Sequence, residues 1–183
     1  MPPGHYCPEV VRGSRYSKGE LVQIITWQIG RRPSIEFRVA RECDYGWPAV
    51  IINSPFNASG DPNPNLYYLS CPHLRLELAR LEDAGSIAGL QRSVGDDPDL
   101  KLSLEIAQVA HDHEWRRAAD QRAGSVGGAR VNIAGSKKTT HLKCLHAHFA
   151  YFLTHEDYTI GLRIAEILGN TWCDDEMCAK WKE

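Results

Sequence analysis

Residues 35–52 read IEFRVARECDYGWPAVII, and their pattern is the starting point for predicting the fold. Its first half alternates apolar and polar side chains, with Ile35, Phe37 and Val39 as apolar members, which is the period-two pattern of a half-buried strand. Residues 47–52 form a second apolar run, and the Cys-Asp-Tyr-Gly sequence before it is typical of a tight turn. The stretch therefore predicts an antiparallel β-hairpin.

The rest of the chain adds another strand and several helices. We expect a third strand at residues 66–69, ending before Pro72 because proline cannot continue the hydrogen-bond ladder. A further short strand is predicted at residues 130–133. Helical spacing and capping residues predict helices over residues 18–28, 74–85, 100–122, 140–153 and 159–169. The order predicts an α+β fold, in which a small antiparallel three-stranded sheet, the hairpin plus the third strand, packs against about five helices.

The length of 183 residues is typical of one domain. We expect a single domain over residues 1–183, with an N-terminal arm (1–17), a glycine-rich basic loop (124–139) and a C-terminal tail (170–183). No apolar run approaches the roughly 20 residues that a membrane-spanning helix needs, and the N-terminus lacks the pattern of a secretion signal. The sequence therefore predicts a cytoplasmic protein without membrane contact.

The six cysteines are interpreted as reduced thiols or metal ligands, because a cytoplasmic chain rarely holds disulfides. None of them forms a Cys-x-x-Cys pair. Cys43 follows the first predicted strand and Cys71 follows the third. In an antiparallel three-stranded meander these two ends share one edge of the sheet, so we expect the two sulfur atoms to lie close together.

Cys144 lies in the helix predicted over residues 140–153. Projected at about 100° per residue, it shares one face with His141, His148, Tyr151 and His155, whereas His146 projects onto the apolar face and should be buried. Thiolate and neutral imidazole are the usual ligands of zinc, so this stripe is a candidate metal site. The alternative is an ordinary exposed helix face that happens to contain histidines.

Positive charge gathers between residues 116 and 143, where seven lysines and arginines face one aspartate. The glycine-rich part of this segment leads towards a helix N-terminus, which favours anions, although it does not match the phosphate-binding P-loop pattern. Arg130, Lys137 and Lys143 are the candidate anion contacts. The alternative is a solvated helix face followed by a flexible loop.

Three segments together resemble one uncharacterised bacterial family, domain of unknown function number 501: residues 43–48, 66–72 and 143–146. The resemblance extends from Gly30 to Trp172 and implies no particular reaction. It favours His146 over His148, which a helix beginning late, with Cys144 in its first irregular turn, would explain. The matching positions are Cys43, Gly46, Pro48, Cys71, Pro72, His111, Gly127, Gly128, Lys143, Cys144 and His146.

Our leading hypothesis is a metal site built by Cys43, Cys71 and Cys144, with His146 as fourth ligand. Such a site could hold zinc or an iron-sulfur cluster. An open coordination position would make the protein an enzyme acting on a small anionic or nucleotide-like substrate. The residues expected to bind that substrate are Arg130, Lys137, Lys143 and His111.

Two other functions remain open from the sequence. One is a non-catalytic binding module, with a structural zinc or no metal, that presents its basic segment to RNA or to a protein partner. The other is a cysteine nucleophile, Cys144 or Cys71, activated by histidine and lysine.

Overall fold

The computed structural model describes residues 15–57, 59–123, 128 and 130–182. Parts of the predicted arm and glycine-rich loop, and Cys7, lie outside these residues. The fold is α+β, as predicted. Its one described sheet has the order β1-β2-β3, with antiparallel neighbours, and comprises β1 (Phe37–Glu42), β2 (Pro48–Asn53) and β3 (Tyr67–Leu69).

The hairpin closes where the sequence predicted it. The backbone N–H of Cys43 donates to the carbonyl of Trp47 across the turn, and Gly46 adopts a φ of 78°, which favours glycine. Strand β1 begins two residues later than expected, after an irregular passage that follows Pro33.

Six α-helices and two short 3-10 helices accompany this sheet in the described part of the chain. Their bounds are α1 Lys18–Ile29, α2 Pro72–Asp83, α3 Ser86–Asp96, α4 Pro98–Ala123, η1 Ile133–Gly135, α5 Leu145–Phe152, α6 Thr159–Leu168 and η2 Met177–Lys182. Helix α3 was not predicted. The strand predicted at residues 130–133 is wrong, because residues 130–132 belong to no strand of the sheet and η1 begins at Ile133.

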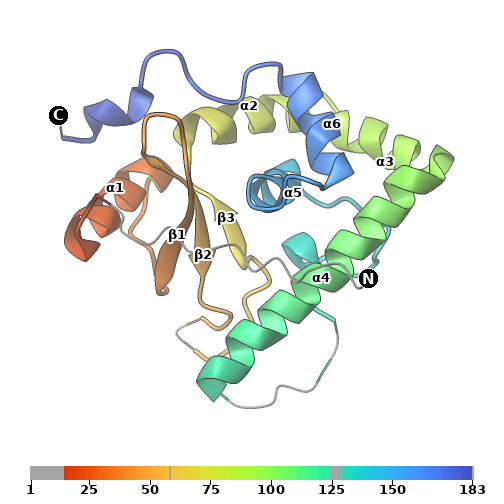
Figure 1. The fold of residues 1–183 in the computed structure, drawn as a ribbon, viewed down its shortest axis with the longest axis horizontal. Helices are drawn as coiled ribbons and strands as arrows, with labels where there is room; N and C mark the ends of the chain where they lie inside the picture. Colours follow the sequence, from red (N-terminus) through yellow and green to blue (C-terminus); the bar gives the residue numbers. More distant parts are fainter. Residues whose placement is uncertain (1–14, 58, 124–127, 129, 183) are drawn as a thin grey trace.

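Helix α5 lies at the centre of the molecule. In Figure 1 the sheet lies between α1 and α5, and α5 is surrounded by α2, α6 and β3. Leu145 and Phe149 of α5 are fully buried in the main core, together with Leu74 of α2, Leu104 of α4 and Ile160 of α6. The side chains at the beginning of α5 are therefore held by a rigid environment.

No helix in the described ranges is both long enough and apolar enough to cross a membrane.

Candidate functional site

Helix α5 begins at Leu145, with Cys144 as the residue that precedes it, and not near Thr140 as the sequence suggested. Long side chains from other helices hold this approach in a non-helical path. Gln91 of α3 accepts from the backbone N–H of Leu142 and donates to the carbonyl of Thr140. The late start that the family resemblance required is confirmed.

The late start overturns the predicted polar stripe. His148 is fully buried, and Tyr151 and His155 are also buried, so they do not form an exposed face. His146, which was expected to be buried, is partly exposed, as is Cys144. The projection failed because residues 140–144 do not continue the helix on which it was based.

Cys144 and His146 meet Glu82, which lies in the last turn of α2. The Cys144 Sγ atom lies 3.8 Å from His146 Nδ1, and His146 Nδ1 lies 3.2 Å from Glu82 Oε1. One ligand atom from each residue lies within 4.8 Å of the other two. Among the described residues, no other group of three Cys, His, Asp or Glu side chains meets this criterion.

Backbone contacts fix the two partners of Cys144. Glu82 Oε1 accepts a hydrogen bond from the backbone N–H of Leu145 at 2.6 Å, which caps α5. His146 Nε2 lies 2.9 Å from the carbonyl oxygen of Arg75 in α2. These two contacts hold α5 against α2, so the packing of the two helices determines where the three side chains lie.

Acceptors surround the imidazole of His146. Its hydrogen bond with Cys144 raises the pKa of His146 to about 9, although burial acts in the opposite direction. The Arg75 carbonyl and the Glu82 carboxylate add to the increase. The site therefore favours the positively charged imidazole when no other cation is bound.

Cys43 and Cys71 do not join this group. Cys71 immediately precedes α2, whereas Glu82 lies eleven residues further on, which is about 16 Å of helical rise. The expected proximity of Cys43 and Cys71 stays a prediction, although Cys71 belongs to the main core and Cys43 packs against that core. Burial raises the pKa of Cys71 to about 12.

Cys178 lies in a small second core against which Cys43 also packs, although no role was predicted for Cys178 from the sequence. It is buried, and its Sγ accepts a hydrogen bond from Gln28 Nε2 at 3.3 Å. Burial raises the pKa of Cys178 to about 11, and the charge of Cys43 contributes. Buried thiols that stay protonated at neutral pH are poor nucleophiles and pack as small apolar groups.

The predicted substrate-binding residues are spread over the molecule. His111 is buried in the core, where its Nδ1 lies 2.9 Å from the carbonyl oxygen of Val131, and burial lowers its pKa. Arg130, Lys137 and Lys143 are exposed. Of these, Lys143 directly precedes Cys144 and is closest in sequence to the three-residue group.

Sequence reasoning missed Glu82. Nothing local distinguishes this residue from the other acidic residues of α2, Glu77 and Asp83. Its position beside Leu145 depends on the packing of α2 against α5, and the two residues are more than 60 positions apart in the sequence. Only knowledge of that helix pair could have identified it.

Comparison with known proteins gives one result. The family described as "Protein of unknown function (DUF501)" matches residues 39–166, a range that contains Glu82, Cys144 and His146. No curated protein and no solved structure matches the chain.

Proposed function

Because the chain belongs to the DUF501 family, whose description names no reaction, we propose from the geometry of its side chains that it binds a divalent transition metal, best matched by zinc, through Glu82, Cys144 and His146. The observation that carries this proposal is the convergence of one sulfur, one nitrogen and one oxygen ligand atom within 4.8 Å. These are the three ligand types that zinc binds in proteins.

The distances fit such an ion. Zinc–ligand bonds of about 2.0–2.3 Å in a tetrahedron place neighbouring ligand atoms about 3.3–3.8 Å apart. The separations of 3.8 Å between Cys144 Sγ and His146 Nδ1, and of 3.2 Å between His146 Nδ1 and Glu82 Oε1, require only small adjustments. Side-chain rotations of that size leave the helix packing unchanged.

The surroundings of the ligands also suit a metal. A metal-bound histidine usually donates its second ring N–H to a carbonyl or carboxylate, which fixes the ring and its tautomer. The Arg75 carbonyl, 2.9 Å from His146 Nε2, supplies this partner and leaves Nδ1 to face Cys144 and Glu82. The Leu145 N–H holds the Glu82 carboxylate in the same manner.

The donor set favours zinc over an iron-sulfur cluster. Clusters are held mainly by thiolates, and this group offers one thiolate beside an imidazole and a carboxylate. Three protein ligands leave a fourth position for water or a substrate, as in catalytic zinc sites. A bound zinc would supply Lewis-acid chemistry, and the partial exposure of Cys144 and His146 gives small molecules access.

Metal content of purified variants tests this proposal. We expect one zinc per wild-type chain, and at least a tenfold loss of zinc affinity in Cys144→Ser and in Glu82→Gln, measured by competition with a chelator. Cys173→Ser is the matched control, because Cys173 is a free, partly exposed thiol outside the group, and it should bind zinc like the wild type.

Cobalt substitution identifies the ligand directly. The thiolate-to-cobalt absorption should disappear in Cys144→Ser and persist in Glu82→Gln and Cys173→Ser. Circular dichroism establishes that each variant is folded. Wild-type zinc affinity in the folded Cys144→Ser protein would eliminate the proposed site.

A thiolate nucleophile is the second candidate function, favoured by the 3.8 Å contact between Cys144 Sγ and His146 Nδ1 at the beginning of α5. In metal-free protein, iodoacetamide should then alkylate Cys144 faster than Cys173, and His146→Gln should remove the difference. Equal alkylation rates would exclude this candidate.

Partners and location follow from the same proposal. Cys43, Cys71, Cys144, Cys173 and Cys178 are free thiols, which persist most readily in a reducing compartment, so we propose that the protein acts in the cytoplasm. The exposed Lys143, beside Cys144, suits a small anionic substrate. An RNA or protein partner on the basic segment with Arg130 and Lys137 is the non-catalytic alternative, and salt-dependent binding of a polyanion to zinc-free protein would favour it.

A further inference from the structure

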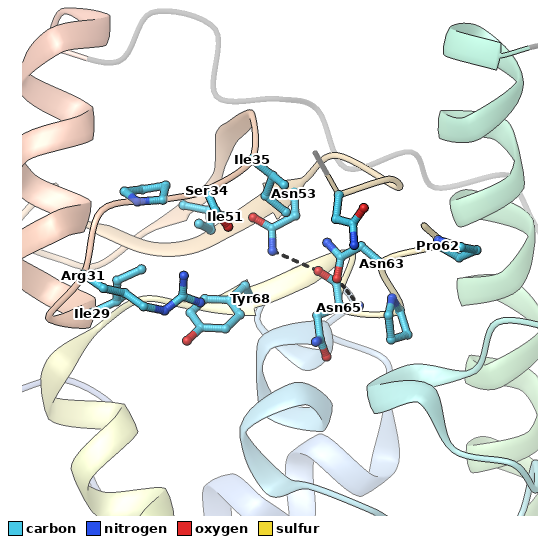
Figure 2. A pocket seen from close by; sticks show the side chains of 13 residues that line it. Ile29, Arg31, Ser34, Ile35, Ile51, Asn53, Pro62, Asn63, Asn65 and Tyr68 are labelled. Carbon is cyan, nitrogen blue, oxygen red and sulfur yellow. Dashed lines mark hydrogen bonds between the residues drawn. The ribbon is translucent and has the colours of Figure 1, made fainter. Parts of the chain in front are cut away.

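We propose that a pocket beside the sheet binds a small organic anion that carries hydroxyl groups. The pocket has a volume of about 320 Å³ and lies between the end of α1, strands β2 and β3, and the loop of residues 57–65 (Figure 2). This volume is at the lower end of the range of ligand sites, which run from about 300 to 1,000 Å³. It therefore suits a compact metabolite.

One part of the pocket wall is apolar. Ile29 at the end of α1, Ile35 before β1 and Ile51 of β2 line it together with the ring of Tyr68 in β3. Ile51 and Tyr68 are paired across the sheet, so this surface is fixed by backbone hydrogen bonds. It can pack against the C–H groups of a sugar or polyol.

Charge in the pocket has one sign. Among the described residues that line it, Arg31 is the only charged one. Figure 2 shows Arg31 beside Tyr68, and the carboxamides of Asn53, Asn63 and Asn65 towards the other end. A guanidinium group presents a fork of donors that matches a carboxylate or a phosphate, and no acidic lining residue competes for it.

The loop opposite Arg31 is held by its own amides. Asn63 Nδ2 donates to the Ser54 carbonyl, and Asn63 Oδ1 accepts from the backbone N–H of Asn65. Trp115 of α4 donates to the Asn63 carbonyl at 2.8 Å. The described residues at the end of this loop are thus held in place before any ligand arrives, which lowers the entropic cost of binding.

Several polar atoms of the pocket are left for a ligand. Asn53 Nδ2 donates to the Asn65 carbonyl at 3.0 Å, and Asn53 Oδ1 accepts no hydrogen bond from the described residues. Among the described residues, the Asn65 carboxamide and the hydroxyls of Ser34 and Tyr68, which also line the pocket, likewise have no hydrogen-bond partner. Carboxamides and hydroxyls that both donate and accept are suited to the hydroxyl groups of a polyol.

The pocket walls connect to the proposed metal site. Arg75, whose carbonyl contacts His146, donates from its guanidinium to the Gln28 carbonyl, one residue before Ile29 of the pocket. On the other side, a Cβ atom on Gly135 would lie 3.2 Å from Pro64 and 4.0 Å from Lys143 Nζ. Arg75, which contacts His146, and Lys143, which precedes Cys144, therefore lie close to residues that adjoin the pocket.

Calorimetric titration of the full chain tests the pocket with four probes: ribose 5-phosphate, gluconate, ribose and inorganic phosphate. We expect ribose 5-phosphate or gluconate to bind saturably and at least tenfold more tightly than ribose or inorganic phosphate. The better of the first two identifies the anion as a phosphate ester or a carboxylate. Chelator-treated protein is used, so that a failure of the zinc proposal leaves this result unaffected.

Arg31→Gln should weaken binding of that probe at least tenfold, and Asn65→Asp should weaken it by charge repulsion. Arg32→Gln is the matched control, because Arg32 lines an adjoining hollow of about 590 Å³ and is absent from the proposed pocket. Both arginines are exposed, so neither substitution threatens folding. The proposal is overturned if no probe saturates, if inorganic phosphate binds as tightly as the organic anions, or if Arg32→Gln has the larger effect.

Discussion

At the scale of single residues, the buried histidine His111 links stability to pH. Burial lowers its pKa below the ordinary value of about 6.5, so the folded protein keeps it neutral while the unfolded chain takes up a proton on acidification. The contribution of His111 to stability is therefore complete above the unfolded pKa, and it is lost as the pH falls from there towards the lower folded pKa.

We predict that His111→Asn reduces the loss of unfolding free energy between pH 7.5 and pH 5. Asparagine can still donate to the Val131 carbonyl but does not titrate, so the variant should show the smaller pH dependence. Urea unfolding at both pH values gives the two free energies. His113→Asn, at an exposed position of the same helix, serves as control and should keep the wild-type dependence. An equal loss of unfolding free energy between the two pH values in His111→Asn and in the wild type would contradict the proposed effect of His111.

Individual residues of the candidate site could be predicted only in part. Cys144 and His146 were identified from the sequence and from the family resemblance, and they do lie together. Glu82 could not be identified, because its position beside Leu145 is set by the packing of α2 on α5. Sheet topology and the family resemblance grouped Cys43 and Cys71 with Cys144, but Cys71 precedes α2, whereas Glu82, which meets Cys144, lies in the last turn of that helix.

At the scale of elements, the contact between α5 and α6 depends on a glycine. An added Cβ on Gly161 would lie 2.1 Å from Cβ of Phe152, far closer than carbon atoms can approach. Gly161→Ala should therefore force the two helices apart and lower the free energy of unfolding by about 3 kcal/mol or more. Because Cys144 directly precedes α5 and His146 lies in its first turn, the variant should also bind zinc more weakly.

Gly89→Ala is the control for this prediction. It also lies inside an α-helix, α3, and its added Cβ would approach only the end of the Arg92 side chain at 4.0 Å. Since alanine is the better helix former, Gly89→Ala should raise stability by about 0.5–1 kcal/mol. Thermal and urea unfolding of both variants measure the contrast, and equal stabilities would refute the packing argument.

The sequence predicted elements well where local signals were strong. Helix α1 has its boundaries as expected, because Ser17 and Glu20 form a capping box and Gly30 ends the helix with a φ of 74°. Helix α5 was extended too far towards the N-terminus, because the contacts that hold residues 140–144 outside it come from Gln91 and Glu82. Helix α3 was missed because Gly85, Gly89 and Gly95 give it a low local helix propensity.

At the scale of the whole molecule, the C-terminal segment is a structural part of the fold. The sequence predicted a C-terminal tail at residues 170–183. This segment makes long-range contacts with the first half of the chain: Glu176 accepts from Trp47 Nε1 at 3.0 Å, and Cys178 accepts from Gln28 at 3.3 Å. Cys178 and Trp47 also form a small second core with Ile24 of α1.

Removal of residues 171–183 should therefore destabilise the protein, because it exposes Ile24 and Trp47 and leaves Gln28 without one of its partners. The burial lost predicts a decrease in unfolding free energy on the order of 3 kcal/mol. Urea unfolding followed by circular dichroism compares the full and shortened chains, with Glu176→Ala as a milder variant that removes only the Trp47 hydrogen bond. Since α1 leads directly into the pocket wall that contains Arg31, the shortened chain should also bind the pocket probe more weakly. A shortened chain with the stability of the wild type would contradict the prediction, because α1 and the hairpin would then hold together without this segment.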